Sequence, residues 1–167
     1  MNRSTPQMRN FAKRLMAYET GGNKSYETKI LVAFLVAEKL RLHLGTFMGN
    51  TGFHTLLARS LALAIAEVPW LRAVRVKADG SLEGVTELQG QLTPEELFEG
   101  GVVLLAQLLG LLVTFIGENL TLRLVREVWP KAPLDELDFD NAAKNGAGGE
   151  TEYRGKNEYR GKNEKNN

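Results

Sequence analysis

The longest stretch without a charged residue constrains this chain more than any other feature. Residues 100–117 read GGVVLLAQLLGLLVTFIG and lie between Glu99 and Glu118. An apolar run of this length lies at the boundary between a deeply buried core helix and a helix that spans a membrane. The sequence favours the core helix, because predicted helices at residues 25–44 and 51–68 supply apolar faces that would enclose it. A single membrane span at residues 100–117 is the alternative.

The start and the end of this helical region are well marked. Thr93 fits the N-cap position, and Pro94 fits the first turn, where no backbone donor is needed. Glu96 is placed to complete a capping box with Thr93. A helical pattern continues as far as Pro130, which cannot extend it.

Small and polar residues of this region gather on one side of the predicted helix. Five of them fall within about a quarter of the circumference: Gln107, Gly110, Thr114, Gly117 and Thr121. Small residues let a neighbouring backbone approach closely, in membranes and in soluble bundles alike. These five residues are the candidates for helix packing or for an interface between molecules. We expect the tightest contact at Gly110 and Gly117, with a kink near Gly117 as the alternative for that residue.

The remaining segments predict an all-α fold. Residues 6–19 have the pattern of a basic amphipathic helix, and residues 25–44 and 51–68 that of apolar helices. An Asp-Gly turn signal between alternating residues predicts a small β-hairpin near residues 72–86. Together these elements predict a compact bundle of about four to five helices with a disordered C-terminal tail.

The predicted organisation has three parts. Residues 1–24 form a basic N-terminal helix and linker, residues 25–139 the helical domain, and residues 140–167 the disordered tail. The tail contains a tandem repeat, EYRGKN followed by EYRGKN, which is too short to build a solenoid. We interpret it as a tolerated duplication, with a binding motif as the alternative.

Charge and composition limit the classes of partner. Residues 1–60 carry nine Lys or Arg against three Asp or Glu, within a chain of net charge +1. Without interleaved aromatic residues or a recognisable DNA-binding motif, this is weak evidence for nucleic acid, and none is expected. The chain has no Cys, which excludes disulfides and a thiolate nucleophile and fits a reducing compartment. No apolar secretory signal is predicted at the N-terminus. The expected location is cytoplasmic, with inner-membrane association as the alternative.

Residues able to carry chemistry form no recognisable constellation. The segment at residues 45–51 is one residue short of a phosphate-binding loop, and Asn50 stands where that loop needs lysine. His43 and His54 flank the same turn, with no carboxylate within one helical turn of either in the sequence and no Cys in the chain, which makes a poor metal site. We therefore expect no enzyme activity, no catalytic residue, no metal and no cofactor. A small-molecule ligand remains open.

Four segments resemble a group of small bacterial proteins of unassigned function. They read EVPWLRAV at residues 67–74, KADGSLEG at 77–84, QLLGLLVTFIG at 107–117 and RLVREVWP at 123–130. The likeness covers roughly residues 29–139. It implies a bacterial source and a real folded unit, but no activity and no functional residue.

Three hypotheses of function from different classes follow. The leading one is a non-enzymatic helical interaction or assembly module that binds a protein partner or a second copy of itself. The second is a small protein anchored by a single membrane span at residues 100–117. The third is a ligand-binding or phosphotransfer-like signalling bundle that uses the region between His43 and His54.

Overall fold

Helices make up most of the chain that the structure describes. The structure is a computed structural model, and it describes residues 4–21, 26–88 and 90–133. In chain order the elements are α1 (Pro6–Thr20), α2 (Tyr26–Glu67), β1 (Arg75–Val76), β2 (Leu82–Glu83), α3 (Pro94–Ile116) and α4 (Glu118–Val128). Short 3-10 helices follow α2 at Pro69–Ala73 and β2 at Thr86–Leu88. This confirms the predicted helical bundle with a small hairpin; the predicted tail and its repeat lie outside the described residues.

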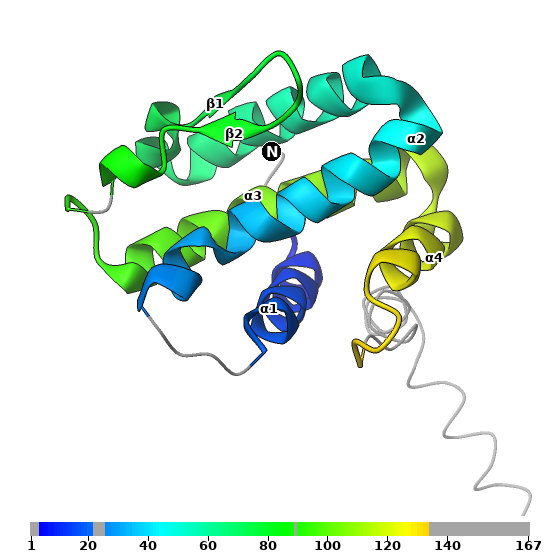
Figure 1. Cartoon of the computed structure of the whole chain (residues 1–167), viewed down its shortest axis with the longest axis horizontal. Coiled ribbons are helices and arrows are strands. Elements are labelled where there is room, and N and C mark those ends of the chain that lie inside the picture. The colour runs from blue at the N-terminus through cyan, green and yellow to red at the C-terminus, as the bar shows by residue number, and fades with distance from the viewer. Residues whose placement is uncertain (1–3, 22–25, 89, 134–167) are drawn as a thin grey trace, which may run out of the picture. The chain divides into compact units, whose positions relative to one another are not determined.

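A sharp bend divides α2 into two arms, residues 26–48 (arm 1) and residues 50–67 (arm 2). Gly49 alone departs from helical geometry, with φ 81° and ψ 159°, a conformation open to glycine but not to residues with a Cβ. Arm 2 then runs back along the bundle (Figure 1). The arms correspond to the two predicted helices. The connection expected between the predicted helices 25–44 and 51–68 is reduced to one non-helical residue, because a single positive-φ glycine suffices to redirect the chain.

α3 is the central helix of the bundle. Its start carries the predicted capping box, in which Glu96 N donates to Thr93 Oγ1 and Thr93 N donates to Glu96 Oε2. Every residue from Gly100 to Leu109 is buried. α3 is long and apolar enough to cross a membrane, yet 61% of its most apolar stretch is buried inside the bundle. The apolar run is therefore used as a core helix in this structure.

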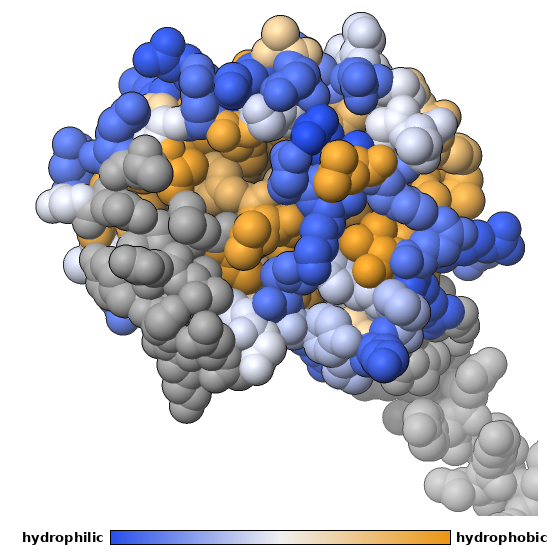
Figure 2. Space-filling model, in the orientation of Figure 1, coloured by the Kyte–Doolittle hydropathy of each residue, from blue (hydrophilic) through white to orange (hydrophobic). Residues whose placement is uncertain are grey.

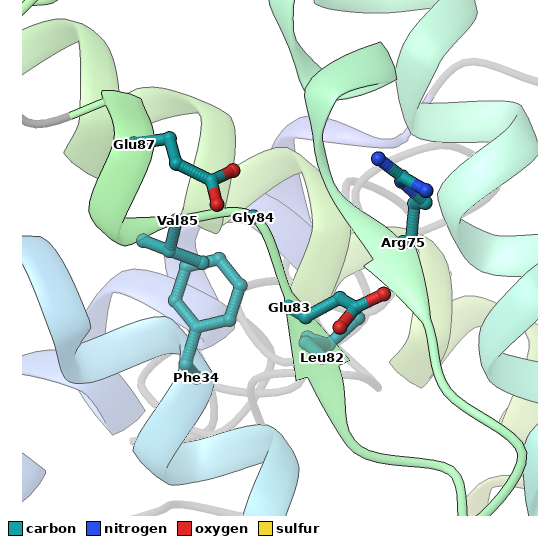
Figure 3. A pocket seen from close by; sticks show the side chains of 7 residues that line it. All are labelled: Phe34, Arg75, Leu82, Glu83, Gly84, Val85 and Glu87. Atoms are coloured by element: carbon teal, nitrogen blue, oxygen red, sulfur yellow. The ribbon is translucent and has the colours of Figure 1, made fainter.

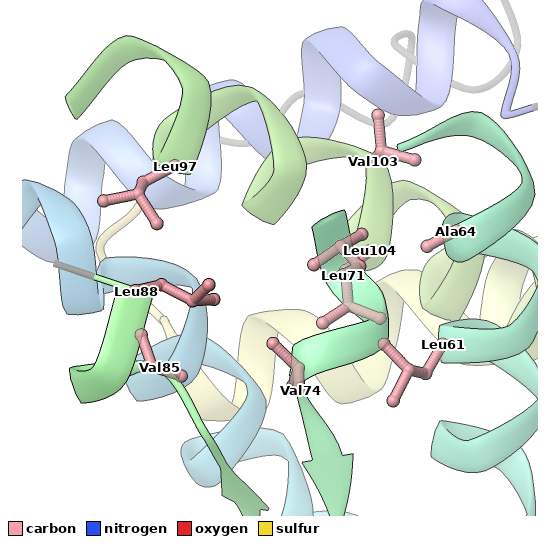
Figure 4. Packing of buried hydrophobic residues seen from close by; sticks show 9 residues of the cluster. All are labelled: Leu61, Ala64, Leu71, Val74, Val85, Leu88, Leu97, Val103 and Leu104. Atoms are coloured by element: carbon pink, nitrogen blue, oxygen red, sulfur yellow. The ribbon is translucent and has the colours of Figure 1, made fainter. Parts of the chain in front are cut away.

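The core on one side of α3 joins elements that are far apart in the sequence (Figure 4). Arm 2, the first 3-10 helix, the segment after β2 and α3 all contribute to it. Its buried members are Leu61, Ala64, Leu71, Val74, Val85, Leu88, Leu97, Val103 and Leu104. The hairpin segment thus packs against the helices, which a two-stranded sheet needs in order to be stable. Its strands pair antiparallel, with Arg75 opposite Glu83.

The other side of α3 is covered by α1. Phe11, Leu15 and Met16 of α1 are buried, and Met16 reaches the backbone of α3 at Gly101. Gly21 is the C-cap of α1: its φ of 59° is left-handed, and its N–H donates to the Tyr18 carbonyl. The described part of the predicted 1–24 segment is thus a helix packed on the bundle.

Candidate contact surface

The most enclosed carboxylate of the bundle belongs to Glu67, whose side chain is 8% exposed. It accepts hydrogen bonds from Arg9 Nη2 (2.7 Å), Ser4 N (3.1 Å) and Gln107 Nε2 (3.1 Å). Burial acts to raise the pKa of Glu67, but the hydrogen bonds from Gln107, Ser4 and Arg9 outweigh it and hold the pKa below its ordinary value. Glu67 joins the N-terminus, α2 and α3, and its lone pairs are occupied by these donors. Its role is to hold the fold together.

A second group of polar contacts ties α1, arm 1 and α4 together. Glu19 accepts a hydrogen bond from Trp129 Nε1 (2.8 Å) and pairs with Lys39 Nζ (2.6 Å). The Nε2 atom of His43 lies 2.7 Å from Glu127 Oε2. A shallow groove of about 660 Å³ lies beside Glu19 and Trp129. Among the described residues, no group of three or more acidic or histidine side chains could hold a metal ion.

One of the hollows on the described part of the chain lies beside the hairpin (Figure 3). It measures about 380 Å³ and is lined by Phe34, Val85, Arg75, Glu83 and Glu87 among others. The three charged side chains are exposed. Ligand sites in proteins are largely apolar hollows with a few buried polar groups that fix the ligand. This hollow has none of the latter, so it does not point to a specific ligand.

The five residues predicted to lie on one side of a single helix (the predicted stripe) differ in their burial. Gln107 and Thr121 are buried, Gly110 is half-buried, and Thr114 and Gly117 are exposed. A Cβ at Gly110 would meet no atom within 4 Å, so the tightest contact expected there is wrong. The physical reason is that α3 is packed on only one side beyond Leu109: Leu112 is still buried, whereas Thr114 is exposed. Gly117 ends α3 with φ 86° and ψ 164°, so the kink, and not the close contact, is correct for this residue.

The close approaches lie earlier in the same run, at Gly100 and Gly101. A Cβ at Gly100 would overlap the ring of Trp70, and one at Gly101 would lie 2.6 Å from the Cβ of Ala33. Both partners are distant in sequence. Spacing within residues 100–117 therefore could not identify these two glycines as the packing positions.

A repeated local motif accounts for the two breaks in the helices. Residues 46–50 read TFMGN and residues 114–118 read TFIGE. Gly49 and Gly117 share nearly the same backbone conformation, with φ 81° and 86° and ψ 159° and 164°. In each copy a phenylalanine precedes the glycine by two residues. The same four-residue motif, Thr-Phe-apolar-Gly, thus ends arm 1 and α3.

The two copies of the motif lie at the same end of the bundle. Arm 1 and α3 run side by side in the same direction (Figure 1) and touch at Ala33 and Gly101. Phe47 follows Ala33 by fourteen residues, and Phe115 follows Gly101 by fourteen residues. At 1.5 Å per helical residue, each lies about 21 Å further along its helix. The two phenylalanines therefore reach the same level.

This end of the bundle combines exposed apolar side chains with an absence of charge. Residues 42–58 contain no Asp, Glu, Lys or Arg, and neither do residues 100–117. The most exposed large hydrophobic side chains of the described chain lie in these two runs: Phe115 (66%), Leu42 (61%) and Phe47 (55%). Figure 2 shows apolar surface on the side where α2 bends. We name the surface formed by residues 42–52 and 110–117 the bend end.

Two features of the sequence indicate this surface. Neither is recognised when residues 42–58 or residues 100–117 are considered separately. One is the second uncharged run at residues 42–58, whose two histidines interrupt its hydropathy. The other is the repeat of Thr-Phe-apolar-Gly at a separation of 68 residues. Each signal becomes informative when both copies are compared. Their convergence at one end is a property of the fold.

Comparisons with protein-family models, with curated proteins and with solved structures find no match for this chain. The resemblance to small bacterial proteins therefore rests on the quoted segments alone, and any inference about function rests on the geometry of the bend end.

Proposed function

We propose that this protein is a non-enzymatic helical interaction module whose bend end is the contact surface. The observation that carries the proposal is the exposure of Phe47 and Phe115 at one end of the bundle, within two runs that lack charged residues. Exposed apolar side chains that gather in one place mark interaction sites more often than scattered ones do.

The size of the exposed surface fits a reversible contact. An aromatic side chain buries about 150–250 Å² when fully covered. With Phe47 and Phe115 just over half exposed, covering both removes roughly 240 Å² of apolar area from water. At about 25 cal/mol per Å² this contributes roughly 6 kcal/mol, which is comparable with the cost of association. The surface thus favours weak or transient binding.

The bundle supports this proposal over a membrane span. Residues Gly100 to Leu109 of α3 are buried by the other helices, so a spanning α3 would have to leave the core that it organises. We accordingly propose a cytoplasmic protein that reaches its partner with one end. The phosphotransfer alternative gains no support, since the Nε2 atom of His43 is already engaged by Glu127.

Photo-cross-linking from single positions tests the proposal even though the partner is unidentified. p-Benzoylphenylalanine would replace Phe47 or Phe115 in the full chain expressed in cells, with Leu35 (46% exposed) as the matched position away from the bend end. Adducts from positions 47 and 115, and none from position 35, are the expected result. No adduct from either phenylalanine position, or equal adducts from all three, would contradict the proposal.

A further inference from the structure

We infer that the partner of the bend end is a second copy of this chain, joined to the first in a domain-swapped dimer. In that dimer α2 is straightened at Gly49. Each copy contributes α1 and arm 1 to a bundle that the other copy completes with arm 2, α3 and α4. This inference rests on the proposed function and names the partner of the same surface.

The connection between the two arms consists of a single residue, Gly49, which we call the hinge. The other residues of the 42-residue α2 have helical geometry. A change of φ and ψ at the hinge therefore turns both arms into one continuous helix, about 63 Å long at 1.5 Å per residue. Straightening also removes two helix ends, whose unpaired backbone groups then pair across the former bend. Because the connection has no slack, the opened arms must find their neighbours in another molecule.

The contacts that join the two sides of the hinge re-form between two copies. Arg9 Nη2 lies 2.7 Å from Glu67 Oε1, and Lys13 Nζ lies 3.7 Å from Glu99 Oε1. In each pair the base precedes the hinge and the acid follows it. Five residues separate α1 from α2, a connection that spans at most about 20 Å, so α1 moves together with arm 1. The exchange thus keeps the core of each bundle intact.

The sequence around the hinge suits a two-fold axis. Residues 42–58 contain no Asp, Glu, Lys or Arg, and this run is centred on Asn50, next to Gly49. In a symmetric dimer the two straightened helices cross near the hinge, so each residue beside the axis lies close to its own copy. A charged residue there would meet a like charge, which disfavours the contact. An uncharged run centred on the hinge therefore favours a second copy, because a partner of different sequence imposes no such symmetry.

The dimer also covers the exposed apolar side chains of the bend end. Phe47 and Phe115 are 55% and 66% exposed in the closed chain, and in the swapped dimer the bend ends of the two bundles face each other. The exposed charged side chains around this surface balance one another: Arg59, Arg123, Glu118 and Glu127. Two copies therefore approach without net repulsion. Exchange adds the contacts of whole helices to the weak contact of the phenylalanines alone.

Two substitutions at the hinge shift the exchange in opposite directions. Alanine is strained at the φ of 81° found at Gly49, so Gly49→Ala should favour the straight helix and raise the dimerisation constant by roughly tenfold per chain. Proline fits the first turn of arm 2 but breaks a helix that continues through it. Asn50→Pro should therefore lower the constant by roughly a hundredfold per chain. Gly90→Ala, which has open space around it away from the hinge, is the matched control.

Analytical ultracentrifugation of the full chain over a range of concentrations measures these constants. We expect the wild type to be monomeric when dilute and to form more dimer as its concentration rises. The Gly90→Ala variant should behave as the wild type does.

Cross-linking shows whether the dimer is swapped. The chain has no Cys, and Lys13 and Glu99 are exposed partners on the two sides of the hinge. A short bismaleimide should link Lys13→Cys to Glu99→Cys within one chain of the closed monomer. In the swapped dimer the same reagent links two chains, which then migrate as a dimer in a denaturing gel. Each single-cysteine variant controls for links between neighbouring molecules.

The outcomes distinguish failure of the exchange from failure of the contact surface. A Gly49→Ala variant that stays monomeric at every concentration, a dimer whose links stay within one chain, or a dimer that Asn50→Pro leaves unchanged would overturn the exchange. Photo-cross-links from positions 47 and 115 to another polypeptide in the same case would leave the contact surface standing. Absence of those photo-cross-links overturns the proposed function itself.

Discussion

Gly100 and Gly110 occupy the same helix but have opposite surroundings. A side chain at Gly100 would overlap the Trp70 ring, whereas one at Gly110 would meet no atom within 4 Å. We expect Gly100→Ala to destabilise the protein by about 1–3 kcal/mol through overpacking. Gly110→Ala should be neutral or stabilise it by up to about 1 kcal/mol, because alanine is the better helix former. Urea unfolding of both variants measures this difference, and equal effects of the same sign would contradict it.

Glu67 gives the stability of the bundle a defined dependence on pH. Its pKa lies below the ordinary value of 4.5 in the folded protein, so the unfolded chain binds more protons in the acidic range. The stabilisation is fully present above the ordinary value and is lost as the pH falls through the folded pKa. Glu67→Gln removes this contribution. Denaturant unfolding at neutral pH and near pH 4 should show a larger loss of stability on acidification for the wild type than for the variant. Equal losses would mean that other carboxylates control the acid response.

Among the secondary-structure elements, the two helix breaks depend on glycine. Gly49 and Gly117 have positive φ and open space around the missing Cβ. An alanine at either position would therefore be strained by the backbone alone, which costs about 1–3 kcal/mol. Gly52 lies in arm 2 with helical geometry, and its Cβ would be in ordinary contact with Met48 at 3.4 Å. Unfolding free energies should fall for Gly49→Ala and Gly117→Ala but not for Gly52→Ala. Three equal values would show that the breaks do not require positive φ.

The elements were predictable where local chemistry defines them. The start of α3 follows from Thr93, Pro94 and Glu96, which lie next to one another and form the cap that their spacing indicates. The hairpin follows from its Asp-Gly turn and alternating pattern. The packing of Gly100 on Trp70 depends on a contact between distant segments, and no periodicity within α3 reports it.

The candidate site at the bend end could not be predicted for the same reason, because it is formed by segments that are distant in the sequence. The predicted stripe treated residues 107–121 as one continuous helix, but Gly117 breaks it and Thr121 belongs to α4. Phe47 and Phe115 come from segments 68 residues apart. They reach one level only because arm 1 and α3 pack in parallel. That arrangement follows from the whole core and not from either segment.

For the bundle as a unit, the core and the proposed contact surface both depend on the position of α3. The other helices must enclose its first part, and its last part must be exposed at the bend end. The absence of Cys in the chain allows a direct measurement with single introduced thiols. Val103 is buried, and Thr114 is exposed on the same helix. The measurement is the rate at which a water-soluble maleimide labels Val103→Cys and Thr114→Cys in the full chain purified without detergent. We predict rapid labelling at position 114 and labelling at position 103 only after urea is added. Equal protection of both thiols, or a protein that cannot be purified without detergent, would contradict the enclosure of α3.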